Sequence, residues 1–194
     1  MMIEEHIKKL HRCFRCGFCK FTSNFTDLNC PSYMRFRFET YSTGGRLWLI
    51  RAWLSGEVEW TKHLAEIIYA CTTCRNCVEQ CVFGFSDDIV NMIVAARSEA
   101  VEQGLVPPIV RDFLNNISKH GNPWGKARSK RAAGLKGVRK YGQQQEYLYY
   151  VGCIGSYDER AQVVAKSLAE LLEMAGVAFG ILGEDEDCDG NEVY

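Results

Sequence analysis

The spacing of its cysteines constrains this chain more than any other feature of the sequence. Eight of the ten cysteines fall into two runs, and within each run the first three stand three positions apart. The fourth cysteine follows after ten residues in the first run and after three in the second. Two-residue gaps let one loop direct three thiolates at a single centre. The runs are Cys13, Cys16, Cys19 and Cys30, followed by Pro31, and Cys71, Cys74, Cys77 and Cys81, followed by Val82.

This pattern is typical of a protein that binds two [4Fe–4S] clusters, each of which needs four thiolates from different directions. In such pairs the fourth cysteine of each run binds the cluster that the other run holds. The ten-residue insertion before Cys30 must therefore fold back toward the second run. The expected ligands are Cys13, Cys16, Cys19 and Cys81 for cluster 1, and Cys71, Cys74, Cys77 and Cys30 for cluster 2.

Zinc and disulfide bonds are the alternatives for these cysteines. Structural zinc sites usually consist of two separated cysteine pairs, which is not a triplet spaced at i, i+3 and i+6. Disulfides suit secreted proteins, but residues 1–9 contain early acids and lack the apolar core of a signal peptide. No apolar stretch approaches the roughly 20 residues of a membrane span. We therefore expect a reduced, cytoplasmic setting in which the cysteines bind metal.

Charge and two residues inside the runs bear on the chemistry. A formal net charge of −1 gives no general attraction to nucleic acid or anionic lipid, and no nucleic-acid-binding signature appears. Gly17 allows the backbone to approach a sulfide and donate an N–H, although a tight turn explains it equally well. Arg75 holds the corresponding place in the second run, where its charge would favour the reduced cluster unless it is simply solvated.

Helical periodicity dominates the first part of the chain. Ser86 is the expected N-cap of the longest helix, with Asp87 and Asp88 in its first turn. We expect residues 1–125 to form an α-helical, ferredoxin-like domain that binds both clusters. The expected helices cover residues 1–12, 46–54, 60–70, 86–103 and 109–120.

The second part of the chain has a different pattern. Residues 126–144 carry seven Lys or Arg and no acid, so we expect a linker that is solvated or docks an acidic partner. The sequence then predicts strands at 147–151 and 177–182 around a helix at 157–175. This β-α-β unit makes residues 145–194 the beginning of an α/β domain. Two strands and a helix cannot bury both faces of a sheet, so we expect more chain or a partner to complete it.

Two further cysteines lie outside the runs, and each follows one of the expected strands. Cys153 comes after the first strand and Cys188 after the second. Because the carboxyl ends of parallel strands meet at one edge of a sheet, the two thiols could lie together in a site. The alternative for Cys153 is a small buried residue at the end of a strand.

The chain resembles the cysteine-rich CCG proteins of the heterodisulfide reductase type, which include iron–sulfur subunits of glycolate oxidase and anaerobic glycerol-3-phosphate dehydrogenase. The family repeat is a lone Cys, a gap of thirty-odd residues, Cys-Cys-Gly and a later Cys-x-x-Cys. Here Asp189 replaces the second cysteine of Cys-Cys-Gly, and the sequence ends before any Cys-x-x-Cys. The resemblance rests on both cysteine runs, Gly121-Asn122-Pro123-Trp124-Gly125, Val151-Gly152-Cys153 and Cys188-Asp189-Gly190-Asn191-Glu192.

The resemblance implies an iron–sulfur electron-transfer subunit of a heterodisulfide reductase-like oxidoreductase. Electrons from or to a flavoprotein, a membrane cytochrome or the rest of the same chain would pass through two [4Fe–4S] clusters. They would reach a third redox site near Cys153 and Cys188, where a third iron–sulfur cluster is an option. Because the carboxylate of Asp189 is a harder ligand than a thiolate, the sequence favours electron transfer, or a different redox reaction at the third site, over reduction of the CoM–CoB heterodisulfide.

This interpretation predicts a cytoplasmic protein that meets the inner face of the membrane only through partner subunits. The alternative is a structural metal-cluster or zinc-binding module whose basic linker docks an acidic partner.

Overall fold

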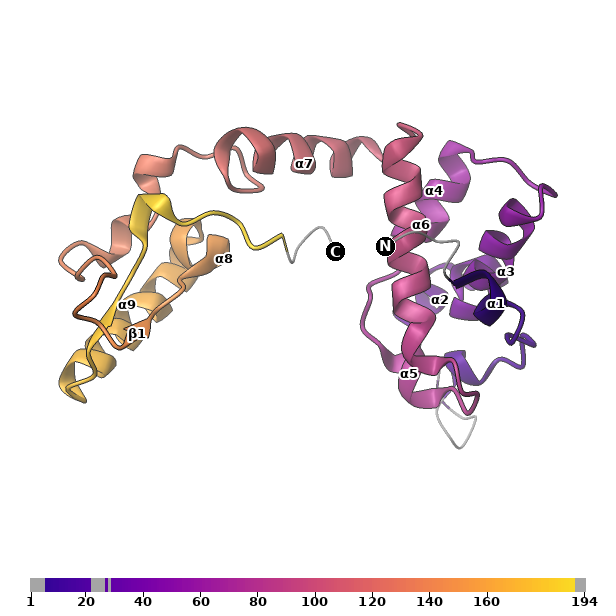
Figure 1. Ribbon diagram of the computed structural model, residues 1–194, viewed down its shortest axis with the longest axis horizontal. Coiled ribbons are helices and arrows are strands. Elements are labelled where there is room, and N and C mark those ends of the chain that lie inside the picture. The colour runs from indigo at the N-terminus through magenta and orange to yellow at the C-terminus, as the bar shows by residue number, and fades with distance from the viewer. Residues whose placement is uncertain (1–5, 22–26, 28, 191–194) are drawn as a thin grey trace. The chain divides into compact units, whose positions relative to one another are not determined.

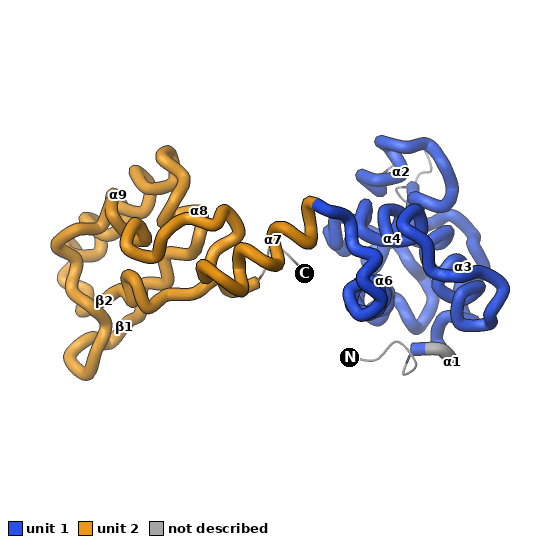
Figure 2. Tube along the Cα trace, turned by 90° about the horizontal axis from the view of Figure 1, so that it is seen from above, with its two compact units in different colours: residues 1–108 blue, residues 109–194 orange. Residues whose placement is uncertain are grey.

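The computed structural model describes residues 6–21, 27 and 29–190. Three sequence-based expectations therefore fall partly outside the described residues: the helix at 1–12, the insertion at 20–29, and the Asn191-Glu192 end of the resemblance. The chain forms two compact units that divide between Pro108 and Ile109 (Figure 2). In the part of the chain that is described, no helix is long and apolar enough to cross a membrane.

The first unit is helical, and α6 is its longest described helix (Figure 1). Helices α3, α4 and α5 pack against α6. The core between them includes Leu47, Ile50, Ile68, Met92 and Ile93, all of which are almost completely buried. Its elements are α1 (Ile7–Leu10), η2 (Phe18–Lys20), α2 (Pro31–Phe36), η3 (Glu39–Tyr41), α3 (Thr43–Leu54), α4 (Lys62–Tyr69), α5 (Asn76–Gln80), η4 (Ser86–Asp88) and α6 (Ile89–Glu102).

Helix α3 begins three residues before the sequence predicts. The hydroxyl of Ser42 caps it by accepting a hydrogen bond from Gly45 N over 3.1 Å. Gly45 is needed for close approach, because a Cβ there would lie 2.0 Å from the carbonyl oxygen of Glu39. The paired glycines Gly44 and Gly45 lie in the buried first turn of this helix.

The start of α6 also differs from the expectation. Ser86 lies inside a 3-10 turn, and the α-helix begins at Ile89 with no side-chain cap from Asp88. The carboxylate of Asp88 instead contacts α1, where it accepts a hydrogen bond from Lys9 Nζ over 2.7 Å. Asp88 therefore forms a long-range ion pair, although the local sequence placed it in the first turn of the helix.

The second unit contains a small parallel sheet crossed by a helix. Strands β1 (Tyr147–Leu148) and β2 (Phe179–Gly180) pair in parallel, with Tyr147 opposite Phe179. Helix α9 (Glu159–Met174) connects them and buries Ala165 and Ala169 against the sheet. The predicted β-α-β order is present, but the strands are shorter than 147–151 and 177–182. The other elements are α7 (Pro108–His120), η5 (Arg128–Lys130), η6 (Ala133–Leu135), α8 (Gly152–Tyr157) and η7 (Gly183–Asp185).

Residues 126–144, expected to be a linker, pack within this second unit. Leu135 belongs to its hydrophobic core, and Arg131 is buried. Tyr141 N donates to the carbonyl of Ile181 over 2.9 Å, next to an isolated parallel bridge between Lys140 and Ile181. The division between units consequently lies at 108/109, whereas the sequence suggested a boundary at 125. Composition alone could not reveal this, because the partners of the segment lie about 50 residues further along the chain.

Candidate metal centres

One pocket of the first unit is lined by Cys13, Cys16, Cys19 and Cys81. Three of these cysteines come from the first run, and the fourth comes from the end of the second. The other walls are largely apolar. They include Phe14, Phe18, Leu47, Phe83, Phe85 and Ile89.

The two cysteine loops repeat the same backbone conformation. Arg15 and Gly17 have positive φ angles of 53° and 89°, and the corresponding Thr73 and Arg75 have angles of 51° and 63°. Two left-handed residues in alternation turn each loop so that successive cysteines converge. The sequence repeat is therefore also a structural repeat. Arg75 adopts a left-handed backbone conformation that is less strained for glycine, which holds the same place in the first loop.

The second group of thiols contains Cys30, Cys71, Cys74 and Cys77. Burial raises the pKa of Cys77 to about 11, and the nearby thiols of Cys71, Cys74 and Cys30 act in the same direction. Thr73 N donates to Cys71 Sγ over 3.4 Å. Cys30 stands directly before α2, and it acts on the pKa of Cys19 in the first run as well as on that of Cys77 in the second.

Burial has a matching effect on the first group. It raises the pKa of Cys19 to about 12, against a hydrogen bond from the backbone of Gly44 that lowers it. A thiol with a raised pKa holds its proton at neutral pH, so binding of iron must release that proton. All ten cysteines are free thiols. Among the described residues, no three His, Cys, Asp or Glu side chains are placed to hold a single metal ion.

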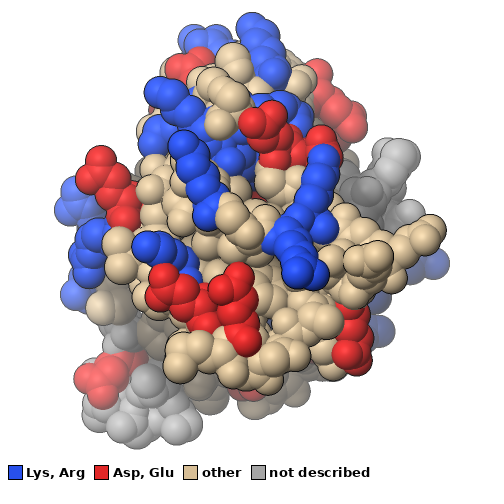
Figure 3. All heavy atoms as spheres, turned by 90° about the vertical axis from the view of Figure 1, so that its left-hand side faces the viewer, with Lys and Arg blue, Asp and Glu red and all other residues tan. Residues whose placement is uncertain are grey.

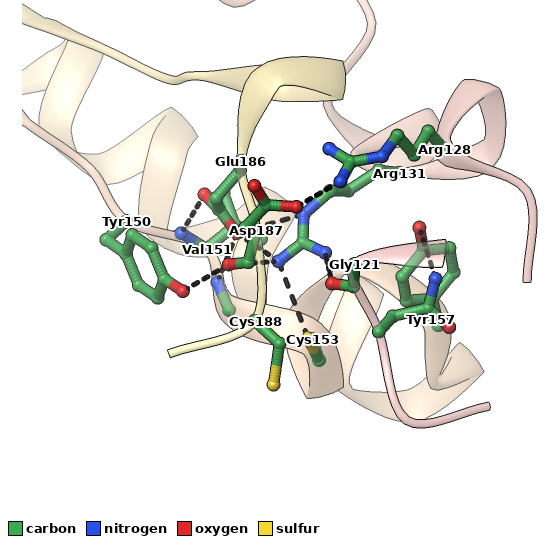
Figure 4. Close-up of polar contacts among 12 residues, drawn as sticks. Gly121, Arg128, Arg131, Tyr150, Val151, Cys153, Tyr157, Glu186, Asp187 and Cys188 are labelled. Atoms are coloured by element: carbon green, nitrogen blue, oxygen red, sulfur yellow. Dashed lines mark hydrogen bonds and ion pairs between the residues drawn. The ribbon is translucent and has the colours of Figure 1, made fainter. Parts of the chain in front are cut away.

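The remaining two cysteines lie in neighbouring segments of the second unit. Cys153 is buried in α8, and Cys188 follows η7 (Figure 4). The carbonyl of Gly121 accepts hydrogen bonds from Cys188 N over 2.9 Å and from Arg131 Nη1 over 3.3 Å. Arg131 Nη2 also donates to Cys153 Sγ over 3.5 Å. One guanidinium and one carbonyl therefore connect the segments that carry the two thiols.

Arg131 and Glu186 form the buried charge pair behind Cys153. Their Nη2 and Oε1 atoms are 2.8 Å apart, and each side chain is only 1% exposed. Glu186 also accepts hydrogen bonds from Val151 N and Gly152 N at 3.0 and 2.9 Å, at the start of α8. Burial alone would lower the pKa of Arg131, but hydrogen bonds with Glu186 and Cys153 outweigh it and raise that pKa.

The basic segment 126–140 meets an acidic loop of its own unit. Arg128 pairs with Asp187 and Lys140 with Asp185, on either side of the buried pair. Figure 3 shows a face on which Lys and Arg side chains are interspersed with Asp and Glu. Three of the seven basic residues therefore form ion pairs with acids of their own unit.

Residues 121–125 form the turn whose Gly121 carbonyl accepts the hydrogen bonds from Cys188 and Arg131. Asn122 is fully buried, and its Nδ2 donates to the carbonyls of His120 and Lys126 at 3.0 and 2.7 Å. Lys126 N donates a hydrogen bond to Asn122 Oδ1 over 3.0 Å.

Asp189, which replaces the second cysteine of the family repeat, is exposed. The pKa of Tyr150 is raised to about 12, mainly by burial and then by the charge of Asp189.

Comparison with known proteins decides the character of the first unit. Residues 9–85 match the family described as a 4Fe-4S dicluster domain. This part of the chain is a 4Fe–4S dicluster domain. It binds two [4Fe–4S] clusters, which confirms the prediction made from the cysteine runs.

The relatives of the dicluster domain are iron–sulfur oxidoreductases. The probable iron-sulfur-binding oxidoreductase FadF of Bacillus subtilis is 37% identical over 137 residues, which cover 65% of this chain and 19% of the relative. EtfAB:quinone oxidoreductase of Syntrophomonas wolfei is 37% identical over 136 residues, covering 66% and 19%. One component of the dihydromethanophenazine:CoB–CoM heterodisulfide reductase of Methanosarcina barkeri is 29% identical over 125 residues, covering 64% and 30%.

These matches confirm the predicted family of heterodisulfide reductase-type iron–sulfur subunits. The chain spans about a fifth of the length of the first two relatives. No solved structure matches it.

Sequence analysis missed several residues around the dicluster domain's thiols. Ser32, Arg46 and Arg97 are buried beside the second group, although Ser and Arg usually stay at the surface. The one available signal is that Arg46 falls among apolar residues, directly before Leu47-Trp48-Leu49-Ile50. Arg131 was counted only as one of seven basic residues, and nothing local marks it as buried.

Proposed function

We propose that this chain is an electron-transfer subunit in which the dicluster domain connects a redox partner with a third redox site near Cys153 and Cys188. The observation that carries the proposal is the single pocket shared by Cys13, Cys16, Cys19 and Cys81. Because Cys81 reaches this pocket from the second run, the two cluster sites interlock. Clusters held in interlocked loops lie close together, as stepwise electron transfer requires.

The ligand sets proposed are those that the sequence suggested. Cys13, Cys16, Cys19 and Cys81 hold cluster 1, while Cys71, Cys74, Cys77 and Cys30 hold cluster 2. Each cluster supplies a one-electron redox centre. The chain supplies the thiolates, the apolar walls that exclude water and the backbone N–H groups that stabilise charge on sulfur. Cys16 and Cys74 are the exposed ligands, and each marks the side from which a partner reaches its cluster.

The second unit is proposed as part of a CCG-type α/β domain. Its support is a parallel strand pair with a helical crossover and a cysteine after each strand. Arg131 and the Gly121 carbonyl draw those two segments together. We propose that Cys153 and Cys188 form a redox site there, with Asp189 as the nearby hard ligand. Iron analysis decides between a third cluster and a site of two thiols.

The partners proposed are other redox subunits. One relative is named for EtfAB and a quinone, and another for dihydromethanophenazine and a heterodisulfide. Each of those names joins two redox partners through one protein. We propose that this chain likewise lies between two partners, such as a flavoprotein and a membrane cytochrome or further redox domains of its own polypeptide.

Oxygen-free purification followed by metal analysis and electron paramagnetic resonance tests this proposal. Two clusters contribute about eight iron atoms per chain, and a third [4Fe–4S] cluster raises the number to about twelve. Both clusters must accept and release an electron reversibly. A colourless zinc protein, or clusters that no one-electron donor reduces, would support a structural module instead.

A further inference from the structure

A fully buried guanidinium lies beside the second group of thiols. Arg46, on α3, is 0% exposed. Its Nε donates to the carbonyl of Ile67 and its Nη1 to that of Tyr41, each over 2.7 Å, while Nη2 donates to Ser32 Oγ over 2.9 Å. All three acceptors are neutral oxygen atoms. These bonds use three of the five N–H donors of Arg46 and leave its positive charge in place.

Short contacts connect this charge to the ligands of cluster 2. The hydroxyl of Ser32 lies 3.5 Å from Cys30 Sγ and donates to the Tyr41 carbonyl over 2.8 Å. Because Arg46 donates to that same carbonyl, Ser32 is free to turn its proton toward a Cys30 thiolate. Burial lowers the pKa of Arg46, with Cys71 and Cys30 acting in the opposite direction. A guanidinium nevertheless stays charged at neutral pH.

Arg97 adds a second buried cation on the same side. Its Nη2 donates to the carbonyl of Cys71, and its guanidinium lies 5.2 Å from the centre of the Tyr69 ring. Arg46 and Arg97 therefore approach two different ligands of cluster 2, Cys30 and Cys71.

Cluster 1 has no matching buried charge among the contacts of the described residues. Lys20, next to Cys19, is neutralised by Glu39, with Nζ and Oε2 only 2.6 Å apart. Arg15 is exposed and lies over the ring of Trp48, 4.1 Å from its centre. The other pocket walls are largely apolar.

Hydrogen bonds to sulfur do not distinguish the two sites. The backbone groups of Arg15 and Gly44 donate to Cys13 and Cys19. At the other site, Thr73 N donates to Cys71 and the side chain of Thr43 to Cys77. The side chain of Trp48 also hydrogen-bonds Cys13, so both sites carry such bonds. What sets cluster 2 apart is a buried positive charge beside its ligands.

We propose that Arg46 raises the reduction potential of cluster 2 above that of cluster 1, so that the first electron taken up by the dicluster domain rests on cluster 2. Uptake of one electron from a one-electron donor adds one negative charge and needs no change of bonds. A positive charge in a low-dielectric interior stabilises that added charge, whereas solvent screens an exposed one. This inference rests on the ligand sets proposed above.

Arg75 provides the matched comparison. It lies in the cluster 2 loop itself, but its side chain is 53% exposed and its Nη2 is 4.0 Å from Asp87 Oδ1. Water and this carboxylate screen its charge. If closeness in the sequence decided the reduction potential of cluster 2, Arg75 would have the larger effect. If burial decides it, Arg46 has the larger effect.

Redox titration of the full chain, followed by electron paramagnetic resonance, tests the order of the two clusters. In Cys16→Ala, which loses cluster 1, the signal with the higher midpoint potential persists. In Cys74→Ala, which loses cluster 2, it disappears. The reverse order overturns the inference. Chains without any reducible cluster would instead contradict the proposed function, so the two failures are distinguishable.

Variants of Arg46 test the cause. Arg46→Gln lowers the midpoint potential of cluster 2 by at least about 59 mV, a tenfold change in the ratio of reduced to oxidised cluster at a fixed potential. Arg46→Lys retains most of the wild-type midpoint potential of cluster 2, and Arg75→Gln shifts that potential by far less than Arg46→Gln does. The midpoint potential of cluster 1 changes little in all three variants. Equal shifts in Arg46→Gln and Arg75→Gln would overturn the role of Arg46. If Arg46→Gln does not fold, the order of potentials in Cys16→Ala and Cys74→Ala, which retain Arg46, decides.

Discussion

Arg131 and Glu186 are 55 residues apart in the sequence and form an ion pair of 2.8 Å in which neither side chain is more than 1% exposed. This pair joins the basic segment to the acidic loop and places a guanidinium donor against Cys153. It buries one residue from each of two charge runs that look like solvated surface in the sequence.

The first prediction concerns this pair. Glu186→Gln leaves the Arg131 charge buried without its counter-ion, so we expect the second unit to lose about 3–5 kcal/mol of stability. Hydrogen exchange of peptides from residues 145–190, measured in the full chain, reports the loss. The control is Asp185→Asn, which breaks the exposed pair with Lys140 and leaves exchange unchanged. Equal protection in both variants would show that the buried pair does not hold the unit together.

The second prediction tests the crosswise ligands of the dicluster domain. Because Cys81 lines the pocket of the first run, Cys81→Ala removes the same paramagnetic signal as Cys16→Ala. Cys30→Ala removes the other signal, as Cys74→Ala does. Each variant lowers the iron content from about eight to about four atoms per chain. Cys153→Ala is the control and keeps both signals. If Cys30→Ala and Cys16→Ala remove the same signal, each run holds its own cluster.

The third prediction concerns the close contact at the start of α3. A Cβ at Gly45 meets the backbone of Glu39 at 2.0 Å, which the helix can relieve only by moving away from η3. We expect Gly45→Ala to destabilise the first unit by about 1–3 kcal/mol. Urea unfolding followed by circular dichroism measures the change. Gly84→Ala, where a Cβ meets nothing within 4 Å, serves as the control and stays close to wild type.

The fourth prediction is a pH dependence at Tyr150. Its pKa is raised to about 12, mainly by burial and then by Asp189 and Glu186, whereas an unfolded tyrosine ionises near pH 10. The folded state thus favours the protonated phenol. Its contribution to stability is complete below about pH 10 and is lost as the pH rises through 12.

Ultraviolet titration of wild type and Tyr150→Phe isolates this ionisation. The difference between the two absorbance curves has its midpoint near pH 12, and the melting temperature of Tyr150→Phe falls less between pH 10 and 12. Tyr147→Phe changes a second tyrosine of the same segment, 54% exposed against 40% for Tyr150, and is the comparison. A difference curve centred at pH 10 for Tyr150→Phe would show that the pKa of this phenol is not raised.

Local sequence was a good guide where the chemistry depends on spacing. Three cysteines at i, i+3 and i+6 predict a loop around a cluster, and the match of residues 9–85 to the dicluster family confirms it. The β-α-β order near residues 147–180 was also predicted, because periodicity is a local property. Strand length was overestimated, since β1 ends at Leu148 and β2 at Gly180 while the expected strands ended at 151 and 182.

The sequence by itself determined that two iron–sulfur clusters bind and which cysteines are available to them, because a thiolate's chemistry and its spacing are written along the chain. The tertiary structure decided which charges are buried. Arg46 and Arg131 look in the sequence like any other arginines, and Gly45 looks like a flexible turn. Their roles depend on Ser32, Glu186 and Glu39, which only folding brings within contact, and burial is what makes a charge or a missing Cβ matter energetically.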